Sequence, residues 1–120
     1  MKKNDIPIWR DASQLLLETE RAVRHFPRYH KYTLGTEMRQ QAMKICQLVS
    51  RAWRDKAHTA DILPRLVLAV DDLKIQLQLG RELQAFRNFA EFEQLAGLAV
   101  RVGKQGEGLS VGSLLFPIAP

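Results

Sequence analysis

Cationic and amide side chains recur along one side of a helix that is predicted to begin near Tyr32 or Gly35 and to end near Ala57. The set advances in steps of four and three residues, which keeps its members on one helix face. It consists of Gln40, Lys44, Gln47, Arg51, Arg54 and His58. No member is acidic, so this face offers positive charge and hydrogen-bond donors. Such a face favours a polyanionic partner whose phosphate groups these side chains bind.

The opposite side of the same predicted helix is apolar. Its residues also follow steps of four and three, and they are Met38, Ala42, Ile45, Val49 and Ala52. The two sets are displaced by two residues, which corresponds to about 200° around the helix axis. The sequence therefore predicts one face that packs in a core and one face that is available for binding.

The positive charge of the chain is concentrated in this region. The formal net charge is +5, and the sequence pI is about 9.7. Residues 28–58 contain seven basic and two acidic side chains, whereas residues 1–27 sum to +1 and residues 59–120 to −1. The charge excess is therefore a local patch. A solvated helix face that binds nothing would have the same composition, and charge alone does not separate the two interpretations.

A short basic and aromatic corner precedes the helix. Cations and rings alternate in the order Arg28, Tyr29, His30, Lys31 and Tyr32. This alternation suits contacts with phosphates and stacked bases, and it equally suits a turn whose tyrosines lie over the end of a helix bundle. The candidate nucleic-acid-binding residues are therefore Arg28, Lys31, Lys44, Arg51, Arg54 and His58.

Four amphipathic helices are predicted to position these residues. The first spans about residues 8–25, with Asp5 as its cap, and ends before Pro27; the second carries the basic face. The third starts near Asp61 and Pro64 and weakens near Gly80, and the fourth spans residues 89–102, from an Asn88 cap to a stop at Gly103. We predict an all-α, antiparallel up-down-up-down four-helix bundle over residues 1–105 and a C-terminal tail over residues 106–120.

The third predicted helix is apolar on more than one side. Its core seam contains Leu63, Leu66, Val70, Leu73 and Leu77. A second set, Leu68, Ile75 and Leu79, points in another direction on the same helix. A helix of this kind is either central in the core or buries its second side against another subunit, and the second option favours an oligomer.

The sequence contains no recognisable catalytic or metal-binding pattern. The sequence has no glycine-rich phosphate loop, no Cys-x-x-Cys or His-Glu-x-x-His motif, and a single cysteine, Cys46, beside the apolar helix face. We therefore expect no enzyme activity, no cofactor and no metal. No apolar run approaches the roughly 20 residues of a membrane span, and Arg10 and Asp11 interrupt the first apolar segment, so we expect a soluble, cytoplasmic protein.

Three segments resemble a known family. They are the corner FPRYHKYTLG at residues 26–35, the Glu37-Met38-Arg39 start of a long helix, and LAVRVGKQG at residues 98–106. Together they are similar to the four-helix-bundle family that includes the accessory variability determinant proteins of diversity-generating retroelements and, more distantly, the 23S rRNA intervening-sequence proteins. The likeness spans nearly the whole chain, and no single motif in it is diagnostic.

The resemblance implies a homopentameric barrel of bundles with a basic surface. A protein of this family binds nucleic acid, as RNA or as a DNA–RNA hybrid, and binds the reverse transcriptase to support mutagenic retrohoming, without a catalytic centre of its own. The apolar, proline-ending tail has no counterpart in the family. A second hypothesis remains open, namely a structural or protein-interaction bundle of the phage or toxin–antitoxin type that does not bind nucleic acid.

Overall fold

The structure, a computed structural model, describes the backbone of residues 5–111 and the side chains of residues 5–109. Four long helices make up most of it: α1 (Pro7–Arg24), α3 (Leu34–Arg54), α4 (Thr59–Glu82) and α5 (Phe89–Val111). Two short elements join them, the single turn α2 (Arg28–Lys31) and the 3₁₀ helix η2 (Lys56–His58). The described residues contain no strand, and the predicted all-α class with four long helices is confirmed.

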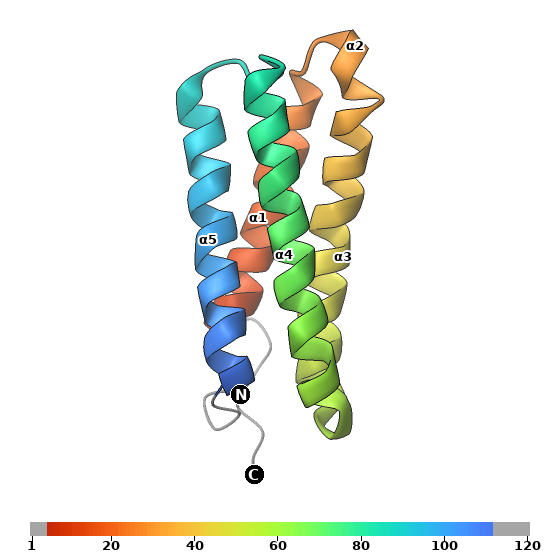
Figure 1. The fold of residues 1–120 in the computed structure, drawn as a ribbon, viewed down its shortest axis with the longest axis vertical. Coiled ribbons are helices and arrows are strands. Elements are labelled where there is room, and N and C mark those ends of the chain that lie inside the picture. The colour runs from red at the N-terminus through yellow and green to blue at the C-terminus, as the bar shows by residue number, and fades with distance from the viewer. Residues whose placement is uncertain (1–4, 112–120) are drawn as a thin grey trace.

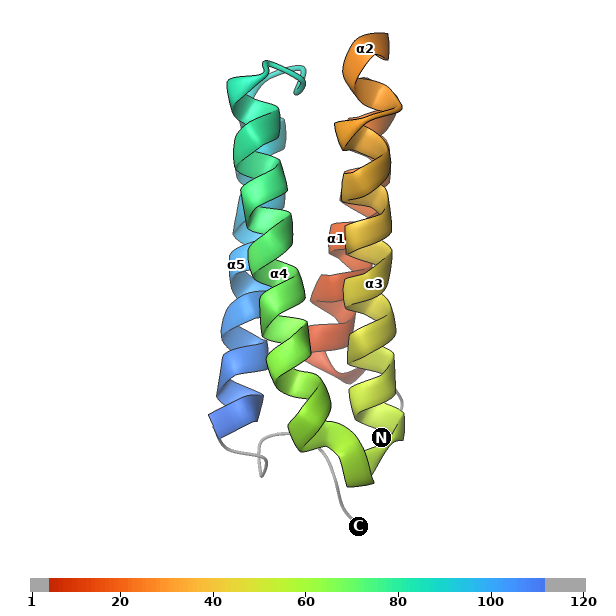
Figure 2. The same ribbon diagram turned by 45° about the vertical axis from the view of Figure 1, so that its right-hand side comes forward.

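Each long helix packs against two of the other three. The packed pairs are α1 with α3, α3 with α4, α4 with α5, and α5 with α1. Figure 1 places α2 and the α4–α5 connection at one end of the bundle, and the α3–α4 connection at the other. The result is a rod of 48 × 22 × 19 Å, and the view in Figure 2 shows the lower end of α4 meeting α3. Residues at opposite ends of α3 are therefore far apart.

The predicted core stripes are confirmed. On α3 the apolar set from Met38 to Ala52 is at most 1% exposed, and the five seam residues from Leu63 to Leu77 on α4 are equally buried. Cys46 is also buried, and its thiol donates a hydrogen bond to the Ala12 carbonyl oxygen at 3.2 Å. These positions lie on the inner side of each helix because apolar residues recur every three or four positions.

The second apolar set of α4 faces outward. Leu68 is 63% exposed, Ile75 58% and Leu79 45%. Of the two explanations offered by the sequence, a central position in the core is therefore wrong for this single chain. We call these three residues the α4 apolar stripe.

The predicted helix stop at Gly103 is wrong, because α5 continues to Val111. Gly103 is buried against α4: a Cβ atom at this position would lie 3.3 Å from Lys74 Nζ and 3.4 Å from Val70 Cγ1. The glycine thus permits close helix packing instead of ending the helix. Residues 106–111, which the sequence placed in the tail, belong to α5, and residues 112–120 of the predicted tail lie outside the described residues.

The helix starts follow the sequence only in part. The cap of α1 is Ile6, without a side-chain hydrogen bond, so the predicted Asp5 cap is wrong. Asn88 does cap α5, since its Oδ1 accepts a hydrogen bond from the Glu91 backbone N–H at 2.9 Å. The Glu91 carboxylate accepts a bond from the Arg87 backbone N–H at 3.2 Å, one residue before the position expected for a capping box.

Gly35 holds the corner close to α1. A Cβ atom on Gly35 would lie 2.7 Å from Val23 Cγ1 and 3.3 Å from the His30 carbonyl oxygen. We therefore expect Gly35→Ala to lower the free energy of unfolding by about 1 to 2 kcal/mol, because overpacking outweighs the gain in helix propensity. The measurement is urea unfolding.

The matched control is Gly97→Ala on α5. Nothing lies within 4 Å of a Cβ atom built at Gly97. The same substitution there should raise the free energy of unfolding by about 0.5 to 1 kcal/mol, since only helix propensity changes. A stabilising effect of Gly35→Ala would contradict the close approach.

Candidate nucleic-acid interface

The outer face of α3 presents three cations to solvent. Lys44, Arg51 and Arg54 are all exposed, and none of them forms an ion pair with another residue of the described range 5–109. Their spacing confines them to about 80° of arc and about 15 Å of helix length. The predicted exposure of this set is confirmed, and we call these residues the α3 cation stripe.

The surroundings of the stripe leave its charge largely uncompensated. Gln40 and Gln47 are exposed beside it, and their amides carry no charge. Glu37 is the single acidic residue of α3 and lies in its first turn, two turns before Lys44. The stripe can therefore supply charged donors to several phosphates in a row.

His58 does not continue the stripe. The sequence predicted helix to Ala57, but α3 ends at Arg54 and His58 belongs to η2. The end is fixed by the Thr59 hydroxyl, which is buried and donates to the carbonyl oxygens of Ala52 at 2.9 Å and Asp55 at 3.2 Å. His58 Nδ1 instead lies 2.9 Å from Asp55 Oδ2, so its charge is matched within the chain.

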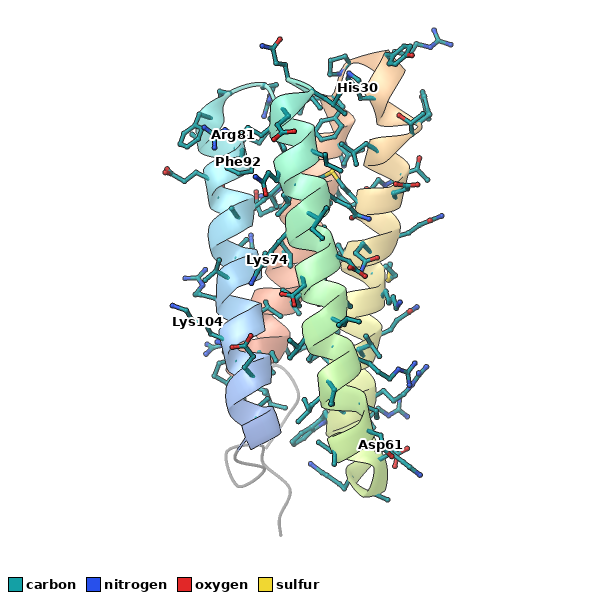
Figure 3. The ribbon with its side chains drawn as sticks, in the orientation of Figure 1. His30, Asp61, Lys74, Arg81, Phe92 and Lys104 are labelled. Atoms are coloured by element: carbon teal, nitrogen blue, oxygen red, sulfur yellow. The ribbon has the colours of Figure 1, made fainter. Side chains whose placement is uncertain are left out.

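The pairing with Asp55 raises the pKa of His58. The main cause is the side-chain hydrogen bond to Asp55, followed by the charge of Asp55; the more distant charge of Asp61, labelled at this end of the bundle in Figure 3, adds a smaller effect, and desolvation opposes the increase. A raised folded-state pKa stabilises the fold below the ordinary value of about 6.5, and this contribution is lost as pH rises through the folded-state pKa.

We expect the NMR titration of His58 to have its midpoint above 6.5, and Asp55→Asn to move the midpoint back toward that value. The destabilisation caused by Asp55→Asn should be larger at pH 5.5 than at pH 8, because the protonated imidazole makes the ion pair. An unchanged midpoint in Asp55→Asn would rule out the pairing.

The tyrosines of the corner do not cover the end of the bundle. Tyr29 is 84% exposed and Tyr32 67% exposed, so the alternative in which they pack over the helices is wrong. Phe26 takes that position: it is 4% exposed and meets Phe86 edge to face, with the ring centroids 5.2 Å apart. The corner thus leaves both tyrosine rings accessible to a ligand.

The two cations predicted at the corner have different surroundings. Arg28 is exposed, whereas Lys31 is half-buried and lines a pocket of about 190 Å³ with Glu20, Val23, Arg24 and Arg39. Arg24 and Arg39 were not among the predicted site residues. The sequence feature that could have identified them is Pro27, because a chain reversal there brings the end of the first helix beside the start of the next long helix.

The predicted residues form two separate clusters. The corner adjoins the first turn of α3, and Arg54 is the last residue of that helix. The 21 residues of α3 place Arg54 about 30 Å from the corner along the bundle, with Lys44 about halfway between them. Figure 1 shows the same separation between α2 and the α3–α4 connection. A ligand that touches both the corner and Arg54 must be an extended polymer or must bind more than one chain.

The described residues offer neither a metal site nor a membrane-spanning helix. Within residues 5–109, no three or more His, Cys, Asp or Glu side chains are grouped so that they could hold a metal ion. None of the described helices combines the length and the apolar character needed to cross a membrane. Among known proteins, no family model and no curated protein matches the chain. The features that characterise the molecule are its all-helical bundle and the exposed cations along α3.

Proposed function

We propose that this protein is a non-catalytic accessory protein of a diversity-generating retroelement, which binds RNA or a DNA–RNA hybrid together with the reverse transcriptase. The observation that carries the nucleic-acid part is the α3 cation stripe. Its three side chains are exposed and have no ion-pair partner among the described residues. The sequence resemblance supplies the retroelement, the reverse transcriptase and the role in mutagenic retrohoming.

The stripe suits contacts with a phosphate backbone. Side chains of this kind bind phosphates without reading the base sequence, so binding should tolerate sequence changes and weaken strongly with salt. The length of the stripe, about 15 Å, matches several successive phosphates of one strand. The proposed protein therefore positions nucleic acid and leaves the chemistry to the reverse transcriptase.

Assembly into an oligomer would strengthen nucleic-acid binding by a stripe of only three cations. We propose the up-down-up-down bundle as the subunit of a pentameric barrel, in which five copies act on one polymer through effective concentration. The exposed α4 apolar stripe supports self-association, because solvent-exposed Leu and Ile gain free energy when another surface covers them. The pentamer number itself comes from the family resemblance.

The proposal is tested by titrating fluorescently labelled RNA and a DNA–RNA duplex with the protein at 50 and 200 mM salt. We expect binding at 50 mM salt and a steep loss at 200 mM. Co-expression with a retroelement reverse transcriptase, followed by co-purification, tests the second partner. Absence of nucleic-acid binding at the lower salt concentration would contradict the proposal.

The second candidate is a structural or protein-interaction bundle. The observation that favours it is the α4 apolar stripe, since an exposed apolar face is typical of a surface that meets another protein. In that case a pull-down recovers a protein partner, treatment with nuclease changes nothing, and the titration above shows no binding at either salt concentration.

A further inference from the structure

Cations from three different elements converge at the corner. Arg24 is the last residue of α1, Lys31 the last of α2, and Arg39 lies in the second turn of α3. They line the pocket of about 190 Å³ together with the Glu20 carboxylate and Val23. The labelled His30 in Figure 3 marks the adjoining turn at this end of the bundle. We call this set the corner pocket.

The single carboxylate in the pocket orients one of the cations. Glu20 Oε1 accepts a hydrogen bond from Arg39 Nε at 2.8 Å, with both side chains partly exposed. This bond uses one edge of the guanidinium and leaves its two terminal nitrogens as donors. Arg24 and Lys31 have no ion-pair partner within the described part of the chain.

The charges of the pocket select among phosphate groups. Three cations and one carboxylate give the lining a net charge of +2. A phosphate monoester carries about −1.5 to −2 at pH 7, whereas a phosphodiester within a strand carries a single negative charge. The monoester is thus the closer match. Its three terminal oxygens also offer more acceptors to donors that arrive from three directions.

We propose that the corner pocket binds the terminal phosphate of a nucleic-acid strand, so that the protein recognises a strand end in addition to the strand's backbone. This inference rests on the proposed nucleic-acid binding and adds a second contact, about 30 Å from the far end of the α3 cation stripe. The Tyr32 ring lies beside the pocket, with its centroid 5.8 Å from Lys31 Nζ, and it is exposed. The base next to the bound phosphate stacks on this ring.

The test compares trinucleotides that are too short to reach from the corner pocket to the far end of the α3 stripe. One carries a 5′-phosphate, one a 3′-phosphate and one has hydroxyls at both ends, so that only internal phosphodiesters remain. Binding is measured by NMR chemical-shift titration at low salt. We expect at least one phosphorylated form to bind about tenfold tighter than the hydroxyl form, because it adds charge-assisted hydrogen bonds. Shifts should concentrate at Lys31, Tyr32 and Arg39.

Two variants with the same change in charge decide whether the pocket is responsible. Lys31→Gln with Arg39→Gln removes two pocket cations, and Arg10→Gln with Arg65→Gln removes two exposed cations elsewhere. The first variant should abolish the preference for the phosphorylated trinucleotide, and the second should keep it. Circular dichroism checks that both variants are folded.

Equal affinity for all three trinucleotides would overturn the inference, and so would a preference that persists in Lys31→Gln with Arg39→Gln. These outcomes are distinct from failure of the proposed function. A long RNA with hydroxyls at both ends has no terminal phosphate, so its binding to the wild-type protein at low salt tests the proposed function alone. If the long RNA does not bind but the phosphorylated trinucleotide does, the corner pocket binds a terminal phosphate and the proposed function is wrong.

Discussion

Reversal of two charges on α3, in the variant Arg51→Glu with Arg54→Glu, is expected to weaken RNA binding about 10- to 100-fold at 50 mM salt. Each arginine supplies one phosphate contact in the proposed complex, and each glutamate adds repulsion to the same phosphate. The slope of log affinity against log salt should fall by about two, one for each lost contact. Fluorescence anisotropy at several salt concentrations measures both quantities.

The control for this experiment is a second double variant, Arg10→Glu with Lys104→Glu, which changes the net charge by the same amount. Both residues are exposed and have no ion pair within the described range, and Figure 3 shows Lys104 on α5, away from α3. Its affinity should fall much less. If both variants lose affinity equally, net charge controls binding and the α3 stripe has no special role.

The interior of each helix could be predicted from the sequence, and the helix ends could not. Apolar residues at steps of three and four define the inner side whatever the partner helix is, so Ile45 and Leu73 were assigned correctly. An end depends on contacts made in three dimensions. The α3 helix stops early because the Thr59 hydroxyl reaches the Ala52 carbonyl, and α5 continues because Gly103 fits against Val70.

The candidate site was likewise only partly predictable from the sequence. The α3 cation stripe was predictable because it lies opposite a strongly apolar face. Such a face packs in the core of any bundle, so the opposite side of the helix is exposed to solvent. The corner pocket was not predictable from spacing, since Arg39 and Glu20 are 19 positions apart and meet only after the chain reverses at Pro27. The pairing of His58 likewise required the actual end of α3. Local periodicity thus fixes which residues are exposed, whereas convergence from separate helices requires the fold.

Ile75→Glu is expected to convert the proposed oligomer to a folded monomer. Ile75 is 58% exposed at the centre of the α4 apolar stripe, between Leu68 and Leu79. Burial of one such side chain contributes about 1.5 to 3 kcal/mol per interface, and an uncompensated carboxylate in the same position adds a desolvation cost. Sedimentation velocity measures the change in mass. Circular dichroism should show unchanged helix content, because the residue lies outside the core.

Leu17→Glu is the matched control, because Leu17 is similarly exposed, at 52%, on α1 and outside the α4 stripe. It should leave the assembly intact. A wild-type protein that sediments as a monomer, or an Ile75→Glu variant that keeps the wild-type mass, would exclude the stripe as a subunit interface.

Ile75→Glu also separates the two sources of nucleic-acid affinity. The variant keeps every cation of the α3 stripe, so any loss of affinity for a long RNA comes from lost multivalency, on the order of 100-fold when several linked sites become one. A trinucleotide engages a single chain and should bind the variant as well as the wild type. The charge reversal on α3 should instead lower the affinity of each single site for long RNA, whether or not the protein is assembled. A long RNA that binds the Ile75→Glu monomer with unchanged affinity would show that one chain supplies the whole binding surface.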